Sequence, residues 1–140
     1  LQNPEKKMSK SDEDPNGTID LLDSPDEIKR KVRIAVTDSG REILFRDDKP
    51  AISNLLTIYS HLSGLSIEDL EKKYQGKGYK EFKEDLAEVI IEFLRPIQEK
   101  YYQIRQDEDY LNKILVDGLK KAKEISQKTM NQVYQAVGLG

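Results

Sequence analysis

At 140 residues the chain has the length of one domain, which is enough to bury a hydrophobic core, and its first residue is a leucine in a loop-like stretch, so we interpret it as a fragment. Its formal net charge of -3 gives no overall positive field that would steer it to nucleic acid or acidic membranes. With no cysteine and one histidine, disulfides, thiol nucleophiles and the usual zinc sites are excluded. No apolar run reaches the roughly 20 residues of a membrane helix and no signal-peptide pattern is present, so we expect a cytoplasmic protein.

The chain opens with a polar segment, residues 1–17, in which Pro4, Pro15, Asn16 and Gly17 disfavour regular structure. This composition predicts a flexible loop. A short extended piece, "TIDLL", follows it.

The first predicted helix begins at "SPDEI". Ser24 can cap it, Pro25 suits the first helical position, and Glu27 completes a capping box. Apolar residues recur on one face at helical spacing, and "TDSG" should end the helix near residue 37.

Four more helices are predicted downstream. One spans about 50–62, a short one spans 66–75, and a long one runs from Tyr79 onward until Pro96 kinks or breaks it. The last covers roughly 108–137 and carries a long apolar stripe, with Gly118 as a weak point. The predicted fold class is therefore an all-α bundle of about five helices, preceded by the flexible loop.

Most candidate metal sites fail on residue type or spacing. His61 has no second histidine or cysteine to form a site with, and a packing or solvent role fits it better. The acidic runs "SDEDP" and "QDEDY" lack the ligand spacing and central glycine of a calcium loop, which favours solvated turns or helix starts. We therefore predict no metal ligands.

The last helix carries a basic arc. Its members face away from the apolar stripe at about 100° per residue; they are Lys113, Lys120, Lys121 and Lys128. Ammonium groups along a rigid helix could neutralise RNA phosphates without reading sequence. Composition alone favours an ordinary solvated face.

The opening loop contains the run Lys7-Met8-Ser9-Lys10-Ser11. Two ammonium groups and two hydroxyls on a mobile loop can gather around a polyphosphate. The run has no carboxylate base and no partnered nucleophile, so its role would be electrostatic, stabilising charge on a leaving phosphate group. A bare pentapeptide of this kind is also common in ordinary charged loops.

The functional interpretation of this run depends on its resemblance to a known family. "KMSKS" is identical to the second signature of class I aminoacyl-tRNA synthetases, and "LLDSPDEIKRKVRIAVTDSG" is similar to the stretch that follows it in the tryptophanyl-tRNA synthetase family. "SNLLTIYSHLSG", "GYKEFKEDLAEVIIEFLRPIQEKY" and "TMNQVYQAVGLG" resemble the helical part of the same family. The likeness covers essentially the whole chain.

The resemblance implies a division of labour. An amino-terminal α/β domain would hold tryptophan and most ATP contacts, the signature loop would close over the ATP phosphates, and the helical domain would bind the anticodon arm of tRNA(Trp). Lys7 and Lys10 would then act catalytically on the pyrophosphate leaving group, with Met8, Ser9 and Ser11 completing the ATP-binding loop. The same context strengthens the hypothesis that the basic arc contacts RNA.

The family's first, histidine-containing signature and a glycine-rich nucleotide turn are both absent from this sequence. We therefore interpret residues 1–23 as the signature loop and a connector from a missing α/β domain, and residues 24–140 as the helical tRNA-binding domain. By itself the chain should be inactive, monomeric and without a bound cofactor. The full enzyme would be a homodimer that uses ATP with magnesium.

Two alternatives remain beside this interpretation. A tyrosyl relative shares the fold, but that family usually departs from Met8 and often carries a further RNA-binding module. A non-enzymatic helical interaction module would make "KMSKS" a coincidence, which the order of the four similar phrases disfavours.

Overall fold

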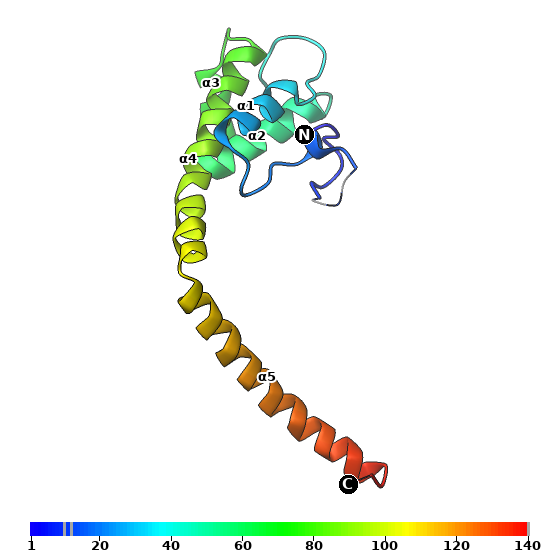
Figure 1. The fold of residues 1–140 in the computed structure, drawn as a ribbon. Coiled ribbons are helices and arrows are strands. Elements are labelled where there is room, and N and C mark those ends of the chain that lie inside the picture. Colours follow the sequence, from blue (N-terminus) through cyan, green and yellow to red (C-terminus); the bar gives the residue numbers. More distant parts are fainter. Residues whose placement is uncertain (10, 12, 140) are drawn as a thin grey trace. The chain divides into compact units, whose positions relative to one another are not determined.

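In a computed structural model, residues 1–9, 11 and 13–139 are described, and within them every regular element is helical. A 3-10 helix, η1, spans Pro15–Gly17. The α-helices are α1 (Pro25–Ile34), α2 (Pro50–Ser63), α3 (Ile67–Lys73), α4 (Tyr79–Gln106) and α5 (Glu108–Ala136) (Figure 1). The all-α prediction with five helices is confirmed.

The helix starts follow local sequence. The Ser24 hydroxyl accepts from the Glu27 backbone N–H at 3.3 Å, and the Glu27 carboxylate accepts from the Ser24 backbone N–H at 3.0 Å, which is the predicted capping box. The Ser24 backbone N–H and hydroxyl both donate to the Glu27 carboxylate, and these two hydrogen bonds lower the pKa of Glu27. At the end of α2, Gly64 adopts φ 74°, a left-handed conformation that glycine tolerates without steric cost.

Of the two predicted effects of Pro96, a kink or a break of the fourth helix, the break is wrong. Helix α4 continues from Tyr79 to Gln106 with Pro96 inside it. Proline removes one backbone donor and so frees a carbonyl one turn earlier. The freed carbonyl belongs to Glu92, which is exposed, so the carbonyl can be hydrated and the helix can continue.

The chain divides into two compact units, Leu1–Gln98 and Glu99–Gly140. The first unit holds a hydrophobic core to which α1, α2, α3 and α4 all contribute. An aromatic cluster lies within it, where the ring centroids of Tyr74 and Phe82 are 5.1 Å apart in an edge-to-face arrangement, and that of Tyr59 is 5.8 Å from Phe82. Figure 1 shows the four helices gathered in this part of the chain.

A polar network joins the edge of this core to solvent. The Tyr74 hydroxyl donates to the Asp85 carboxylate at 2.6 Å and lies 3.1 Å from the Tyr59 hydroxyl, to which Lys73 Nζ donates at 2.8 Å. The hydrogen bond from Tyr74, together with the charge of Lys73, lowers the pKa of Asp85. Burial raises the pKa of Tyr74, so its hydroxyl stays a donor.

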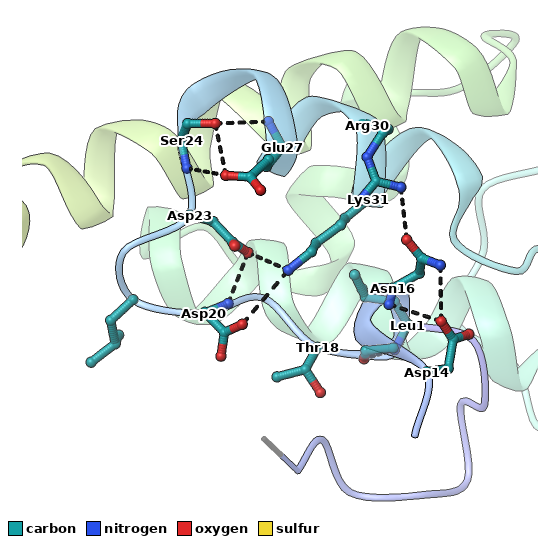
Figure 2. Close-up of polar contacts among 12 residues, drawn as sticks. Leu1, Asp14, Asn16, Thr18, Asp20, Asp23, Ser24, Glu27, Arg30 and Lys31 are labelled. Atoms are coloured by element: carbon teal, nitrogen blue, oxygen red, sulfur yellow. Dashed lines mark hydrogen bonds and ion pairs between the residues drawn. The ribbon is translucent and has the colours of Figure 1, made fainter. Parts of the chain in front are cut away.

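A buried ion pair holds the start of α1. Lys31 Nζ lies 2.6 Å from Asp23 Oδ2, and the two residues are 4% and 8% exposed. The same carboxylate oxygen accepts from the Asp20 backbone N–H at 2.9 Å (Figure 2). Gln98 Nε2, on α4, donates to the carbonyls of Leu21 and Asp23 at 2.9 and 3.0 Å. Residues 20–23 are therefore fixed against α1 and α4.

The second unit consists of the last turns of α4, all of α5 and the residues after it. None of the described residues of α5 is buried, and the predicted apolar stripe is exposed, with Leu115 at 68%, Leu119 at 67% and Ile125 at 68%. Across the described residues, no helix is both long and apolar enough to span a membrane.

Asp23→Asn should lower the free energy of unfolding by roughly 3 kcal/mol, because it leaves the Lys31 ammonium buried without its main partner. Asp23→Asn combined with Lys31→Met should return to within about 1 kcal/mol of the parent, since the buried charge is gone and the new amide can still accept from Asp20. Urea unfolding followed by circular dichroism measures both. A double variant less stable than the single one would contradict the ion-pair account.

Tyr74→Phe should lower the free energy of unfolding by about 1 to 2 kcal/mol, because it removes the hydroxyl that donates to Asp85. The matched control is Tyr79→Phe. The Tyr79 hydroxyl is buried and has no hydrogen-bond partner among the described residues, so its loss should be neutral or stabilising by up to about 1 kcal/mol. Equal destabilisation by both substitutions, in the same urea titrations, would refute the network.

The Tyr74→Phe deficit should also depend on pH. Asp85 has a lowered folded pKa, so its contribution is complete above the ordinary carboxyl pKa of about 4 and is lost as the pH falls through the folded value. The difference between parent and variant should therefore shrink below about pH 4. A difference that grows on acidification would contradict the assignment.

Candidate functional site

The lysine-serine loop, residues 7–11, is attached to the first unit through its methionine. Met8 is partly buried and packs against the hydrophobic core, whereas Lys7 and Ser9 on either side of it are exposed. In this arrangement the apolar Met8 side chain anchors the backbone, and the polar side chains on either side of it can contact a ligand. Lys10, the second predicted catalytic lysine, lies outside the described residues.

The two serines of the loop lie together. Ser9 Oγ and Ser11 Oγ are 3.0 Å apart, and the Ser11 backbone N–H donates to Ser9 Oγ at 3.4 Å. Thr18 Oγ1 donates to the Ser9 carbonyl at 3.1 Å, so the loop is tied to the segment that follows it. Hydroxyl and ammonium groups of this kind can donate to phosphate oxygens.

Lys7 and Met8 line a small cavity of about 140 Å³ together with Leu1, Asp14 and Gly17. Leu1 is buried, and its nitrogen donates to the Gly17 carbonyl at 2.7 Å. The beginning of the chain and the exit of the loop therefore lie side by side at this cavity.

A second set of contacts joins the segment after the loop, residues 14–16, to α1. Asp14 Oδ1 accepts from both the backbone N–H and the side-chain amide of Asn16 at 2.9 Å. Asn16 Oδ1 in turn accepts from Arg30 Nη1 at 2.7 Å (Figure 2). The guanidinium is charged, which makes this a strong hydrogen bond. With the Asp23–Lys31 pair, it makes α1 the support on which the loop is held.

The support was not predicted, although one signal for it is present. Lys31 occupies a position on the apolar face of α1, between Ile28 and Val32, which are both buried. A lysine on such a face needs a buried partner, and Asp23 lies just before the capping serine. Arg30 and Asn16 carry no comparable signal, because both are ordinary polar residues at exposed or half-exposed positions.

The predicted basic arc lies on α5. All four of its lysines are exposed, and Lys120 and Lys128 line a shallow depression of about 440 Å³ together with Lys123 and Glu124. The arc belongs to the second unit and the lysine-serine loop to the first. Across the described residues, no three His, Asp or Glu side chains are arranged to hold a metal ion.

Comparison with known proteins gives a consistent result. The family model of class I tRNA synthetases (W and Y) matches residues 1–95. The chain is 52% identical to a tryptophan–tRNA ligase of Oceanobacillus iheyensis and 48% identical to that of Bacillus subtilis, in each case over 100% of this chain. It spans 43% and 42% of the lengths of those relatives.

A solved structure agrees with the sequence relatives. The crystal structure of a tryptophanyl-tRNA synthetase from Mycoplasma pneumoniae matches with a TM-score of 0.74 and 32% identity, over 100% of this chain and 43% of that one. The lysine-serine loop, the helices that support it and these matches lead to one conclusion: the chain belongs to the class I tRNA synthetases of the tryptophan and tyrosine type.

Proposed function

We propose that this chain is the part of a tryptophan–tRNA ligase that supplies the ATP-phosphate loop and the tRNA-binding helical domain. The observation that carries the proposal is the run at residues 7–11, which stands in a chain similar over its whole length to tryptophan–tRNA ligases. The full-length enzyme would join L-tryptophan to tRNA(Trp) in the cytoplasm, as a homodimer. Residues 1–23 would connect to the catalytic domain, and residues 24–140 would bind tRNA, in part through the basic arc of α5.

The chemistry assigned to the loop is electrostatic. In the first reaction a carboxylate oxygen of tryptophan attacks the α-phosphorus of ATP, and the bond to the bridging oxygen breaks, which gives tryptophanyl adenylate and pyrophosphate. Negative charge grows on the departing pyrophosphate. The ammonium groups of Lys7 and Lys10 would stabilise that charge, with hydroxyls of Ser9 and Ser11 donating beside them. Magnesium, carried on the ATP phosphates, would neutralise part of the same charge.

The exposure of Lys7 and the partial burial of Met8 support this assignment. A group that stabilises the transition state must be placed before the charge develops, because reorganisation during the reaction would cost the energy that it supplies. We propose that Arg30 and Asn16 are positioning residues, since their hydrogen bond ties the loop's exit to α1.

Lys10→Ala in the full-length enzyme should slow adenylate formation by roughly 100-fold to 1000-fold, by analogy with the loss of one preorganised donor to a developing oxyanion. Affinity for tryptophan should barely change, because the contact is strongest in the transition state. Lys10→Arg keeps the charge on a bulkier planar group and should rescue only in part. Single-turnover kinetics at saturating ATP and tryptophan provide the measurement.

The control for this prediction is Lys72→Ala, which removes an exposed lysine of α3, outside the run. Its rate of adenylate formation should stay within about twofold of the parent, as for a surface substitution. A Lys10→Ala enzyme within threefold of the parent would reject the pyrophosphate role.

A further inference from the structure

A groove of about 870 Å³ runs between α1 and the first turns of α4, within the first unit. Five basic side chains line it: Lys29, Arg30, Arg33, Lys80 and Lys83. Ala87 and the partly buried Tyr79 also line it and provide apolar surface. The groove therefore concentrates positive charge in a chain whose formal net charge is -3.

Two of these five side chains have a carboxylate nearby. Lys29 Nζ lies 2.7 Å from Glu88 Oε1, and Lys80 Nζ lies 3.9 Å from Glu84 Oε1. The hydrogen bond and charge of Glu88 raise the pKa of Lys29. The second pair is long and exposed, so it holds Lys80 weakly.

The other three have no carboxylate partner among the described residues. Arg30 donates to the neutral amide of Asn16, and Lys83 donates to backbone carbonyls. Arg33 is exposed and makes no ion pair within the described chain. Against these three charges the groove holds one further acid, Asp26. An excess of positive charge thus remains for a ligand.

Lys83 sits where α1 ends. Its Nζ donates to the carbonyls of Arg33 at 3.0 Å and Ala35 at 2.7 Å, which leaves one of its three hydrogens unassigned. Because it binds, from α4, main-chain carbonyls of the last turn of α1 and of its C-cap residue, its ammonium is held in place. Burial lowers the pKa of Lys83, which is the expected cost of an ammonium group without a carboxylate.

We propose that this groove binds consecutive phosphates of an RNA strand, so that α1 and α4 form a backbone-binding surface of the tRNA domain. The proposal rests on the function proposed above, which supplies the polyanion. Arg33 and Lys80 are exposed, which suits a chain-like ligand that passes across the surface. A small metabolite would instead need a site that encloses most of its surface.

The experiment measures binding of a fluorescein-labelled tRNA(Trp) transcript to the full-length enzyme by anisotropy, at several salt concentrations. The test variant is Arg33→Gln with Lys80→Gln, both exposed positions. Arg30 is left unchanged because it also holds the loop. The matched control is Lys72→Gln with Lys100→Gln, which removes the same charge from exposed lysines outside the groove.

The groove variant should raise Kd roughly 10-fold near physiological salt and flatten the slope of log K against log salt by about 1.5, since each lost phosphate contact contributes about 0.7 to 0.9. A non-cognate tRNA should lose affinity equally, because phosphate contacts carry no sequence. The control should stay within twofold.

Two results would overturn the inference. If the groove variant has the same Kd and salt slope as the control variant, the groove does not bind RNA phosphates. A loss confined to Lys120→Gln with Lys128→Gln would assign the RNA to α5 instead. If the parent enzyme binds no tRNA at all, the proposed function itself fails, and the groove proposal falls with it.

Discussion

The arrangement of the first unit depends on the burial of one ammonium group, that of Lys31. A buried charge is costly unless it is paired, and Asp23 provides the partner at 2.6 Å. If that carboxylate moved away, the lysine would keep only the longer, more exposed contact with Asp20 at 3.8 Å. Since Asp23 also accepts from the Asp20 backbone, and Gln98 donates to the carbonyls of Leu21 and Asp23, the whole segment before α1 is confined. The residues that follow the lysine-serine loop lead into this segment and are therefore held in place as well.

Helix α1 therefore contributes to two surfaces, one facing the lysine-serine loop and one facing α4. Toward the loop it presents Arg30, whose hydrogen bond to Asn16 reaches the residues just after the signature. Toward α4 it presents Arg33 and the carbonyls that Lys83 binds. Arg30 lines the groove and also binds Asn16, so one guanidinium contacts both the proposed RNA-phosphate groove and the segment that follows the proposed ATP-phosphate loop. Because α1 is short, a single residue can contribute to both surfaces.

Sequence patterns predicted the features that depend on neighbours along the chain. The capping box of Ser24 and Glu27 is such a feature, because its partners are three residues apart. The effect of Pro96 was misjudged because it depends on solvent access to a freed carbonyl, which only the tertiary structure gives. The groove was not predicted for a related reason. Lys83 and Ala35 are separated by 48 residues, and neither segment carries a sequence signal that the two are in contact.

The resemblance, rather than the spacing of the residues, gave the loop its proposed chemistry, and the structure adds what holds the loop in place. The most direct test of that account is tryptophan-dependent exchange of pyrophosphate into ATP by full-length enzyme carrying Asn16→Ala. This substitution removes the side-chain hydrogen bonds of Asn16 to Arg30 and Asp14, but it keeps the backbone hydrogen bond to Asp14 and leaves the Asp23–Lys31 pair intact. The account predicts a kcat reduced by about 10-fold or more, because misplacing a reacting group is costly, with KM for tryptophan unchanged and stability within about 1 kcal/mol of the parent. Parent-like exchange by a stable Asn16→Ala enzyme would contradict it.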